Sequence, residues 1–364
     1  MPDKYSLSSV LQQRFVELIV SYLGLEIRDR DQYYLKEKIF LRMKNLGLSD
    51  PKDYYQILAS MNKKSHQEWL EFAILITNVE SYFFRDKGQF NLLRSYLLPE
   101  IIKRQQDKKT IRICSAGCSS GEEIYSIAIL IKELIADLEA WDLTLLGVDI
   151  NQAALQKAKT GIYSPWSFRN IKEKTKEQYF QLVNNQYHID QKIKEMTKFQ
   201  NLNLVKDSFL HPDFQLREMD LILCRNVFIY FDQKSVDKVM EKFYHALQPG
   251  GYFLTGHAEL YGHNLNHFQT QIFTESLIYQ RLANDSLVKK SAQSLTNEYN
   301  HNLAEQFSGL INQTAAEGSY LKMQQVSLNL LKQLPPDTTI PRLGNLTAAQ
   351  LISQLEESLK VSEE

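Results

Sequence analysis

The sequence contains few cysteines and no long apolar run, and each absence excludes a class of protein. Three cysteines in 364 residues, Cys114, Cys118 and Cys224, are too few for a disulfide framework. No stretch approaches the roughly 18 consecutive apolar residues of a membrane-spanning helix. The first residues also lack the basic and apolar segments of a signal peptide. We therefore expect a cytoplasmic protein whose thiols stay reduced.

The chain also lacks a surplus of either charge. Its formal net charge is -1, so the composition gives no reason to expect binding to nucleic acid or insertion into a membrane. Cys114 and Cys118 could suggest half of a metal site, but no histidine or second cysteine pair stands near them in the sequence. We interpret both cysteines as small apolar core residues and expect no metal.

Shifts in pattern along the chain predict three domains. Residues 1–90 place apolar residues at helical spacing, as in "LQQRFVELIVSYLGL", and predict a small all-helical domain. Residues 91–283 alternate strand patterns such as "LTLLGVDI" with helical patterns such as "NQAALQKAKTGIY", which predicts an α/β fold with parallel strands covered by helices on both faces. Residues 284–364 are polar with helical stretches, and predict a helical or partly disordered extension whose partner is unknown.

Two features interrupt this plan. Short alternating segments at about residues 180–200 predict a small antiparallel β insert. Near the N-terminus, "YYLKEKIFLRMKNLGL" predicts a helix with a basic face, which is either solvated or a docking surface for an acidic partner helix. The basic residues of this helix are Lys36, Lys38, Arg42 and Lys44.

Polar residues follow the predicted parallel strands at the points where these strands end. The strand "TIRIC" leads into "SAGCSSGEE", where Gly117 and Gly121 let the backbone approach a ligand, and Asp149 ends the next strand. Ligands of open α/β sheets bind at these carboxyl ends, and an acid after a second strand suits the two hydroxyl groups of a ribose. Glu122 and Glu123 would repel a phosphate, and no Gly-x-Gly-x-x-Gly fingerprint is present. A nucleoside with a positive charge fits this pattern better than a pyrophosphate.

Five sequence blocks, in order and at plausible spacing, resemble the CheR-type chemotaxis receptor methyltransferases. The blocks are "TNVESYFFRD", "SAGCSSGEEIYSIAI", "GVDINQAALQKAKTGIY", "CRNVFIYFD" and "LQPGGYFLTGHAE". The resemblance covers about residues 8–283 and implies a Rossmann-like class I methyltransferase domain. It also implies methyl transfer from S-adenosyl-L-methionine to glutamate side chains of chemoreceptors, with S-adenosyl-L-homocysteine as the product. The positive charges of this cofactor would explain the acidic loop.

The resemblance further implies which residues bind the cofactor. Glu123 and Asp149 should contact it, with Asp149 on the ribose hydroxyl groups, and Gly117 should shape the loop against the methionine part. Asn203 and Leu204 of "NLNLV" match family positions beside the adenine.

The same family blocks assign residues at the other end of the cofactor. Arg225 and Asn226 match positions near its amino-acid end, and Ser81 and Arg85 belong to a block that closes over the cofactor from the N-terminal side. Many family members carry an asparagine two places before the serine. Here that place is Val79 and the asparagine is Asn78, so Asn78 transfers less directly than the others.

The implied reaction asks little of the protein. A glutamate carboxylate is ionised at neutral pH and needs no general base, so we expect catalysis chiefly by positioning in an in-line displacement. Arg85 would steer the acceptor carboxylate and Tyr230 would fix it through its hydroxyl group, although Tyr230 has an alternative as a core aromatic. We expect His257 to be structural, and Glu122 to be a solvated acid favoured by the dipole at a helix N-terminus.

Partners follow from the same resemblance. In the family the β insert docks receptor tails, and residues 187–199 correspond to it; the basic helix resembles the surface offered to the receptor's acidic methylation region. Two other functions stay open: methylation of a non-chemotactic signalling protein, and a module that senses S-adenosylmethionine or its demethylated product and signals through the extension. Methyl transfer to a receptor peptide would separate these possibilities.

Overall fold

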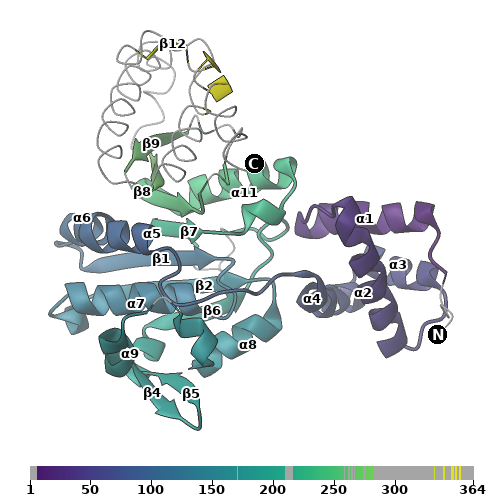
Figure 1. The fold of residues 1–364 in the computed structure, drawn as a ribbon, viewed down its shortest axis with the longest axis horizontal. Helices are drawn as coiled ribbons and strands as arrows, with labels where there is room; N and C mark the ends of the chain where they lie inside the picture. The colour runs from purple at the N-terminus through teal and green to yellow at the C-terminus, as the bar shows by residue number, and fades with distance from the viewer. Residues whose placement is uncertain are drawn as a thin grey trace, which may run out of the picture.

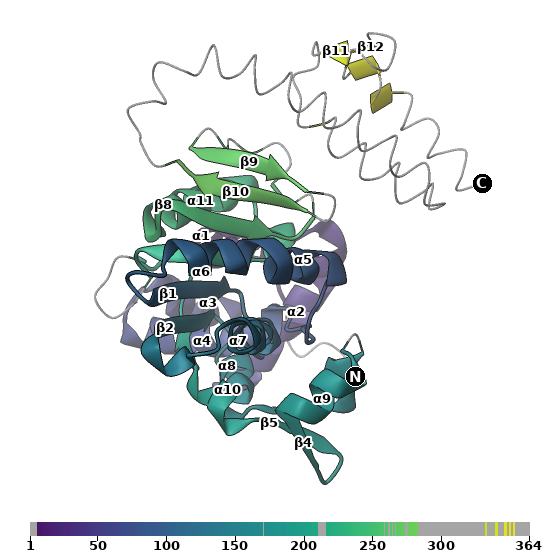
Figure 2. The ribbon, with the colours of Figure 1, turned by 90° about the vertical axis from the view of Figure 1, so that its left-hand side faces the viewer.

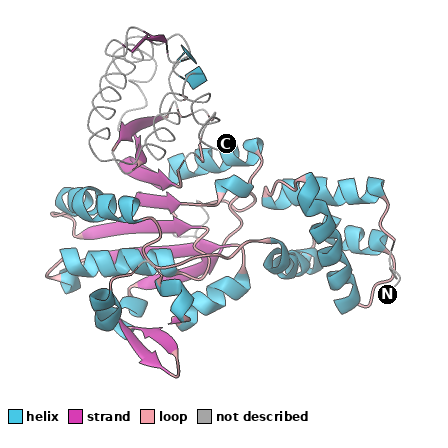
Figure 3. Ribbon diagram, in the orientation of Figure 1, coloured by secondary structure: helices cyan, strands magenta, loops and turns pink. Residues whose placement is uncertain are grey.

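The computed structural model combines a helical N-terminal part with a mixed α/β part, as the sequence predicted (Figure 1). It describes residues 6–169, 171–209, 216–257, 259–260, 263, 265, 267–273, 276–282 and a few scattered residues between 332 and 353. Figure 3 shows helices alone in the N-terminal part and strands in the rest of the chain. Among the described residues, no helix is both long and apolar enough to cross a membrane.

Local signals in the sequence set the boundaries of the N-terminal helices. Gly24 ends the first helix in the left-handed conformation, and the side chain of Asp50 caps a helix that starts at Pro51. One aromatic-rich core, which includes Phe15 and Trp69, joins these helices. The elements are α1 (Ser9–Leu23), η1 (Asp29–Asp31), α2 (Gln32–Asn45), α3 (Pro51–Ala59) and α4 (Lys63–Ile76).

The segment at residues 77–86 connects the two parts of the molecule. Its Phe83 is fully buried, and packs with the core of the sheet rather than with that of the N-terminal helices. The helix that follows also joins the sheet core through Phe90. We propose that the N-terminal domain ends within residues 77–86, slightly before the predicted boundary at residue 90.

Seven strands form the central sheet, in the order β6-β2-β1-β7-β8-β10-β9. The five from β6 to β8 are parallel, and β10 pairs antiparallel with both β8 and β9. The chain starts in the middle, builds outward through β2 and β6, and then crosses to β7, so the switch point lies between β1 and β7. The strands are β1 (Thr110–Ala116), β2 (Asp142–Asp149), β6 (Thr197–Asn201), β7 (Met219–Cys224), β8 (Leu247–Thr255), β9 (Phe268–Ile272) and β10 (Leu277–Arg281).

Both faces of the sheet are buried, which explains the continuous apolar runs of its central strands. In β7, Leu221 and Leu223 pack into one core with α7, whereas Ile222 and Cys224 pack into another with α11. The helices of this part are α5 (Lys87–Leu92), α6 (Leu98–Arg104), α7 (Glu122–Leu134), α8 (Gln152–Thr160), α9 (Glu173–Tyr179), α10 (Gln191–Glu195) and α11 (Gln233–Ala246). Shorter helical turns are η2 (Leu93–Leu97), η3 (Leu138–Ala140), η4 (Pro165–Phe168) and η5 (Phe228–Tyr230).

The small antiparallel insert is present, but its predicted limits of about 180–200 were wrong. It contains β3 (Ile162–Tyr163), β4 (Phe180–Val183) and β5 (Gln186–Ile189) in the order β3-β5-β4. Residues 197–201 instead form β6, which pairs parallel with β2 at the edge of the main sheet. The insert and the β9–β10 edge lie at opposite ends of the α/β part (Figure 2).

Two other segments need comment. The residues "QPGG" lie within β8, where the register against β7 shifts between Met219 and Leu221. The predicted extension, residues 284–364, lies almost wholly outside the described residues. Its described parts include β11 (Thr339–Ile340) and β12 (Leu346–Thr347), which pair antiparallel.

Candidate functional site

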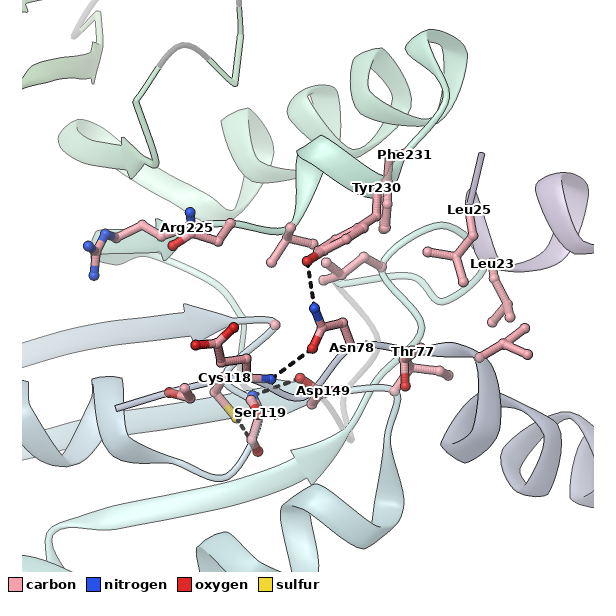
Figure 4. A pocket seen from close by; sticks show the side chains of 18 of the residues that line it. Leu23, Leu25, Thr77, Asn78, Cys118, Ser119, Asp149, Arg225, Tyr230 and Phe231 are labelled. Atoms are coloured by element: carbon pink, nitrogen blue, oxygen red, sulfur yellow. Dashed lines mark hydrogen bonds between the residues drawn. The ribbon is translucent and has the colours of Figure 1, made fainter. Parts of the chain in front are cut away.

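A cavity of about 490 Å³ lies where the carboxyl ends of β1, β2 and β7 face the N-terminal helices. Residues from both parts line it, and Figure 4 shows Leu23 and Leu25 opposite Ser119 and Asp149. The structure brings every predicted cofactor-binding or catalytic residue to this one cavity. These residues are Asn78, Ser81, Arg85, Gly117, Glu123, Asp149, Asn203, Leu204, Arg225, Asn226 and Tyr230.

The loop after β1 turns tightly because Gly117 adopts a positive φ of 71°. A Cβ at this position would lie 2.3 Å from Val227 Cγ2, so only glycine fits between the two loops. The backbone N–H groups of Gly117 and Cys118 both donate to the carbonyl oxygen of Val148, at 2.8 and 3.0 Å. These bonds fix the loop against the end of β2.

Asp149 is held by the backbone on both sides of its carboxyl group. Its Oδ2 accepts from the N–H of Ser119 and its Oδ1 from the N–H of Asn151, each at 2.8 Å. Burial raises the pKa of Asp149, and these N–H groups oppose the shift. Each oxygen retains acceptor capacity, so the carboxylate can accept from two vicinal hydroxyl groups.

Arg225 lines the cavity, but its guanidinium group is turned into the protein. Nε donates to Gln89 Oε1 at 2.5 Å, Nη1 to Glu123 Oε2 at 2.8 Å and Nη2 to the carbonyl oxygen of Arg85 at 2.7 Å. Ser115 Oγ donates to the other oxygen of Glu123 at 2.8 Å. Arg225 therefore positions Glu123 and the Arg85 segment. Gln89 was missed by the sequence analysis, because nothing near it marks a site.

Gln89 connects the guanidinium group of Arg225 to the end of β8 and to Ser276. Its side chain is fully buried, and its Nε2 donates to the carbonyl oxygen of Thr255 and to Ser276 Oγ, each at 2.7 Å. A glutamine has both an acceptor and two donors, so it can join a guanidinium group to a carbonyl without leaving a buried polar atom unpaired.

Asn203 uses its side chain to shape a loop. Its Oδ1 accepts from the N–H groups of Val205 and Lys206, and its Nδ2 donates to the carbonyl oxygen of Tyr22 in α1 at 2.8 Å. The amide thus links the loop after β6 to the N-terminal helices. Leu204 and Asn203 in this loop line the cavity.

Lys242 supports the same loop from α11. Its Nζ donates to the carbonyl oxygens of Leu204, Val205 and Asp207, all at 2.8 Å. Burial lowers the pKa of Lys242 to about 8. This lysine was also missed, since a basic residue on an amphipathic helix is typical of a solvated face.

Two polar side chains meet across the cavity. Asn78 Nδ2 donates to Tyr230 Oη at 2.9 Å (Figure 4), and Asn78 Oδ1 accepts from the N–H of Glu80. Tyr230 is 39% exposed, so the alternative of a core aromatic was wrong. Arg85 also lines the cavity, and its Nη1 donates to the carbonyl oxygen of Glu80 at 3.2 Å.

Two predictions for residues near this cavity can be compared with the structure. Glu122 is fully buried rather than solvated, because Ser120 and Ser167 donate hydroxyl groups to its carboxylate. His257 lies outside the residues that line the cavity, and its Nε2 is 2.5 Å from Asp86 Oδ2.

The predicted basic face of α2 also needs correction. Arg42 points into the N-terminal core, where Nε and Nη2 contact both oxygens of Glu68 at 2.8 and 2.9 Å and Tyr54 donates to the same carboxylate. Lys38 lines the cavity and Lys36 lies 5.5 Å from the ring of Phe40. The helix therefore does not present all four basic residues together.

The fold and the site define a class of enzyme. A strand order of this kind, a glycine loop after β1, an acid at the end of β2 and a cavity with room for a nucleoside fit S-adenosylmethionine. Carboxylates suit its hydroxyl groups and cationic centres, and the tight loop excludes side chains from its path. Sites of this kind belong to the nucleoside-binding α/β enzymes.

Comparison with known proteins identifies the family. The model of the family described as "CheR methyltransferase, SAM binding domain" matches residues 79–277. The chain therefore belongs to the CheR methyltransferase family. A chemotaxis protein methyltransferase of Campylobacter jejuni is 31% identical over 71% of this chain and 92% of its own length. Chemotaxis protein methyltransferase 2 of Vibrio cholerae is 30% identical over 74% and 91%, and a Borreliella burgdorferi relative is 29% identical over 70% and 89%.

Proposed function

We propose that the protein transfers the methyl group of S-adenosylmethionine to glutamate side chains of chemoreceptors, forming methyl esters in chemosensory adaptation. The observation that carries this proposal is the hydrogen bond from Asn78 Nδ2 to Tyr230 Oη. In that bond Tyr230 is the acceptor, so its own hydroxyl proton is left to point elsewhere in the cavity. A phenol that donates into the cavity favours an acceptor substrate with a negatively charged oxygen.

Arg85 supports the same type of acceptor. Arg85 and Tyr230 both line the cavity, and the positive charge of Arg85 would attract a carboxylate. The acceptor is already ionised at neutral pH, so no residue needs to remove a proton. The two side chains therefore act by orienting the acceptor oxygen, and good orientation can contribute on the order of 7–11 kcal/mol.

We assign the cofactor to the other walls of the cavity. When bound, S-adenosylmethionine supplies an electrophilic methyl group. Asp149 would accept from its ribose hydroxyl groups, and Glu123 would face its ammonium group while Arg225 keeps that carboxylate in place. Gly117 and the loop at Asn203 would close the pocket on either side.

We propose a smaller docking surface on α2 than the sequence predicted. Since Arg42 is committed to Glu68, the acidic region of a receptor would meet Lys38 and Lys44 rather than a face of four basic residues. The β insert would bind a receptor tail beside its outer strand, β4, where Leu182 is 57% exposed.

The test is transfer of radiolabelled methyl groups to a receptor signalling fragment. Methyl esters release methanol in mild alkali, and mass spectrometry locates the modified residue. Tyr230→Phe is the matched variant, since it keeps the ring and removes only the hydroxyl group. A lost hydrogen bond to a charged group costs about 1.5–3 kcal/mol, so kcat should fall about 10- to 100-fold with little change in cofactor affinity.

The alternatives give different results. Label that resists alkali, or that appears only on proteins other than receptors, would refute the assignment to receptor glutamates. Cofactor binding without any transfer would favour a sensing module.

A further inference from the structure

We propose that Glu259 is a positioning residue, which holds the turn at residues 225–230 in the form that aims Tyr230 into the cavity. This inference rests on the proposed function, because it concerns how the acceptor is oriented. Glu259 follows β8, and the sequence blocks assign it no role. It lies outside the residues that line the cavity, so it acts through others.

The carboxylate of Glu259 gathers backbone donors from two loops. Its Oε2 accepts from the N–H of Gly256 at 2.7 Å and from the N–H of Asn226 at 3.0 Å. The other oxygen, Oε1, is buried without a hydrogen-bond partner. Burial raises the pKa of Glu259, and the N–H groups of Gly256 and Asn226 oppose that shift. One carboxylate oxygen thus bridges the end of β8, at Gly256, to Asn226 in the turn after β7.

The surrounding backbone is shaped for this contact. A Cβ on residue 256 would lie 2.7 Å from Glu259 Oε2, so Gly256 leaves space that the carboxylate occupies. Asn226 has a positive φ of 59°, a left-handed conformation that is strained for a residue with a Cβ. The hydrogen bond from its N–H to the carboxylate helps to offset that strain.

Among the described residues, no other carboxylate accepts a backbone N–H group of residues 225–230. Tyr230 closes η5 by donating its N–H to the carbonyl oxygen of Val227 at 3.1 Å, so a displaced Val227 would carry Tyr230 with it. The Tyr230 hydroxyl must stay within reach of Asn78 to keep its proton directed at an acceptor. A shift of about 1 Å at such a group can cost on the order of a hundredfold in rate.

The test uses Glu259→Gln in the full-length protein. Glutamine has the same size but no charge, so the hydrogen bonds from Gly256 and Asn226 lose their charge assistance and become roughly half as strong. We expect kcat for receptor methylation to fall about tenfold or more, with KM for S-adenosylmethionine changed by less than about threefold. Hydrogen exchange at the amides of residues 226–230 should accelerate.

A double variant separates positioning from a loss of general stability. If Glu259 acts through Tyr230, the variant Tyr230→Phe/Glu259→Gln should be at most about twofold slower than Tyr230→Phe alone. The matched control is Asp220→Asn, which alters another buried carboxylate that accepts a backbone N–H, from Arg112 at 2.9 Å, near the opposite end of β7. It should lower stability while leaving kcat and exchange at 226–230 unchanged.

Each outcome decides the inference. A kcat for Glu259→Gln within twofold of wild type, or rate losses that multiply in the double variant, would overturn it. If wild type transfers no methyl groups to receptor fragments, the proposed function fails; exchange at residues 226–230 then decides the role of Glu259 by itself. Should Glu259→Gln not fold, Glu259→Asp, which keeps the charge but retracts it by one methylene, is judged by the same criteria.

Discussion

Replacing Arg225 with methionine tests the group that supports the cofactor pocket. The arginine side chain is 2% exposed and that of Glu123 is 15% exposed, so the ion pair between them is almost completely removed from water. Methionine keeps much of the volume but removes the charge and all three hydrogen bonds. Glu123 would then be a largely desolvated carboxylate without its counterion.

The expected cost follows from burial. Removing one partner of a buried ion pair typically destabilises a protein by about 3–5 kcal/mol, since the remaining charge stays desolvated. The carbonyl oxygen of Arg85 and the amide of Gln89 also lose their donor. Arg225→Lys should cost less, about 2 kcal/mol, because an ammonium group keeps the charge but cannot reach all three acceptors.

Urea denaturation measures both effects, and a double-mutant cycle with Glu123→Gln isolates the pair. We expect the double variant to be more stable than the sum of the single changes predicts, by about 2 kcal/mol, because neither charge is then left alone. Calorimetry on the variants that fold should show weaker S-adenosylhomocysteine binding for Arg225→Met.

Additivity within about 0.5 kcal/mol would refute the coupling between Arg225 and Glu123. A control is Arg94→Met, which removes an ion pair with Glu133 whose side chains are 45% and 23% exposed. An exposed pair contributes about 0–1 kcal/mol. An equal loss in both variants would show that burial does not determine the cost.

Three further predictions concern the pocket and α2. Burial raises the pKa of Asp149, and the cofactor hydroxyl groups need an ionised acceptor. The affinity for S-adenosylhomocysteine, measured by calorimetry, should therefore be full at neutral pH and fall as the pH is lowered through that raised pKa. An affinity that does not depend on pH would contradict this. Gly117→Ala should weaken cofactor binding at least about tenfold, whereas Gly47→Ala, with a similar φ of 69° and no atom within 4 Å of the added Cβ, should leave it unchanged. Arg42→Ala should destabilise the fold by about 3–5 kcal/mol and Lys44→Ala by less than about 0.5 kcal/mol; equal stability with lost receptor methylation in Arg42→Ala would restore a docking role.

The central strands could be predicted from sequence because burial on both faces leaves a strong pattern. "MDLILC" is apolar at almost every position, and the structure buries all six residues of β7. The edge strand β6 has the sequence "TKFQN". It is partly exposed, so its sequence contains no continuous apolar run. Its misassignment to the insert follows from that exposure, since only pairing with β2 identifies it as part of the main sheet.

Which residues meet at the cavity was predictable for a related reason. The carboxyl ends of parallel strands converge, so Gly117, Asp149 and Arg225 had to approach one another once β1, β2 and β7 were assigned. The direction of each side chain was not predictable. Arg42 and Lys44 are both basic residues of α2, and only Glu68, which lies far along the chain, decides that Arg42 turns inward.

The direction of Arg225 changes how the electrostatics of the pocket should be understood. An acidic loop alone would attract the cationic cofactor but repel a carboxylate acceptor from the same cavity. Pairing Glu123 with Arg225 largely neutralises one of the two carboxylates, and Asp149 is surrounded by backbone N–H groups that spread its charge. The repulsion that a second anion meets is thereby reduced, while both carboxylates keep oxygens for the cofactor. Under the proposed function, this buried arginine would allow one cavity to accept a cationic cofactor and an anionic acceptor together.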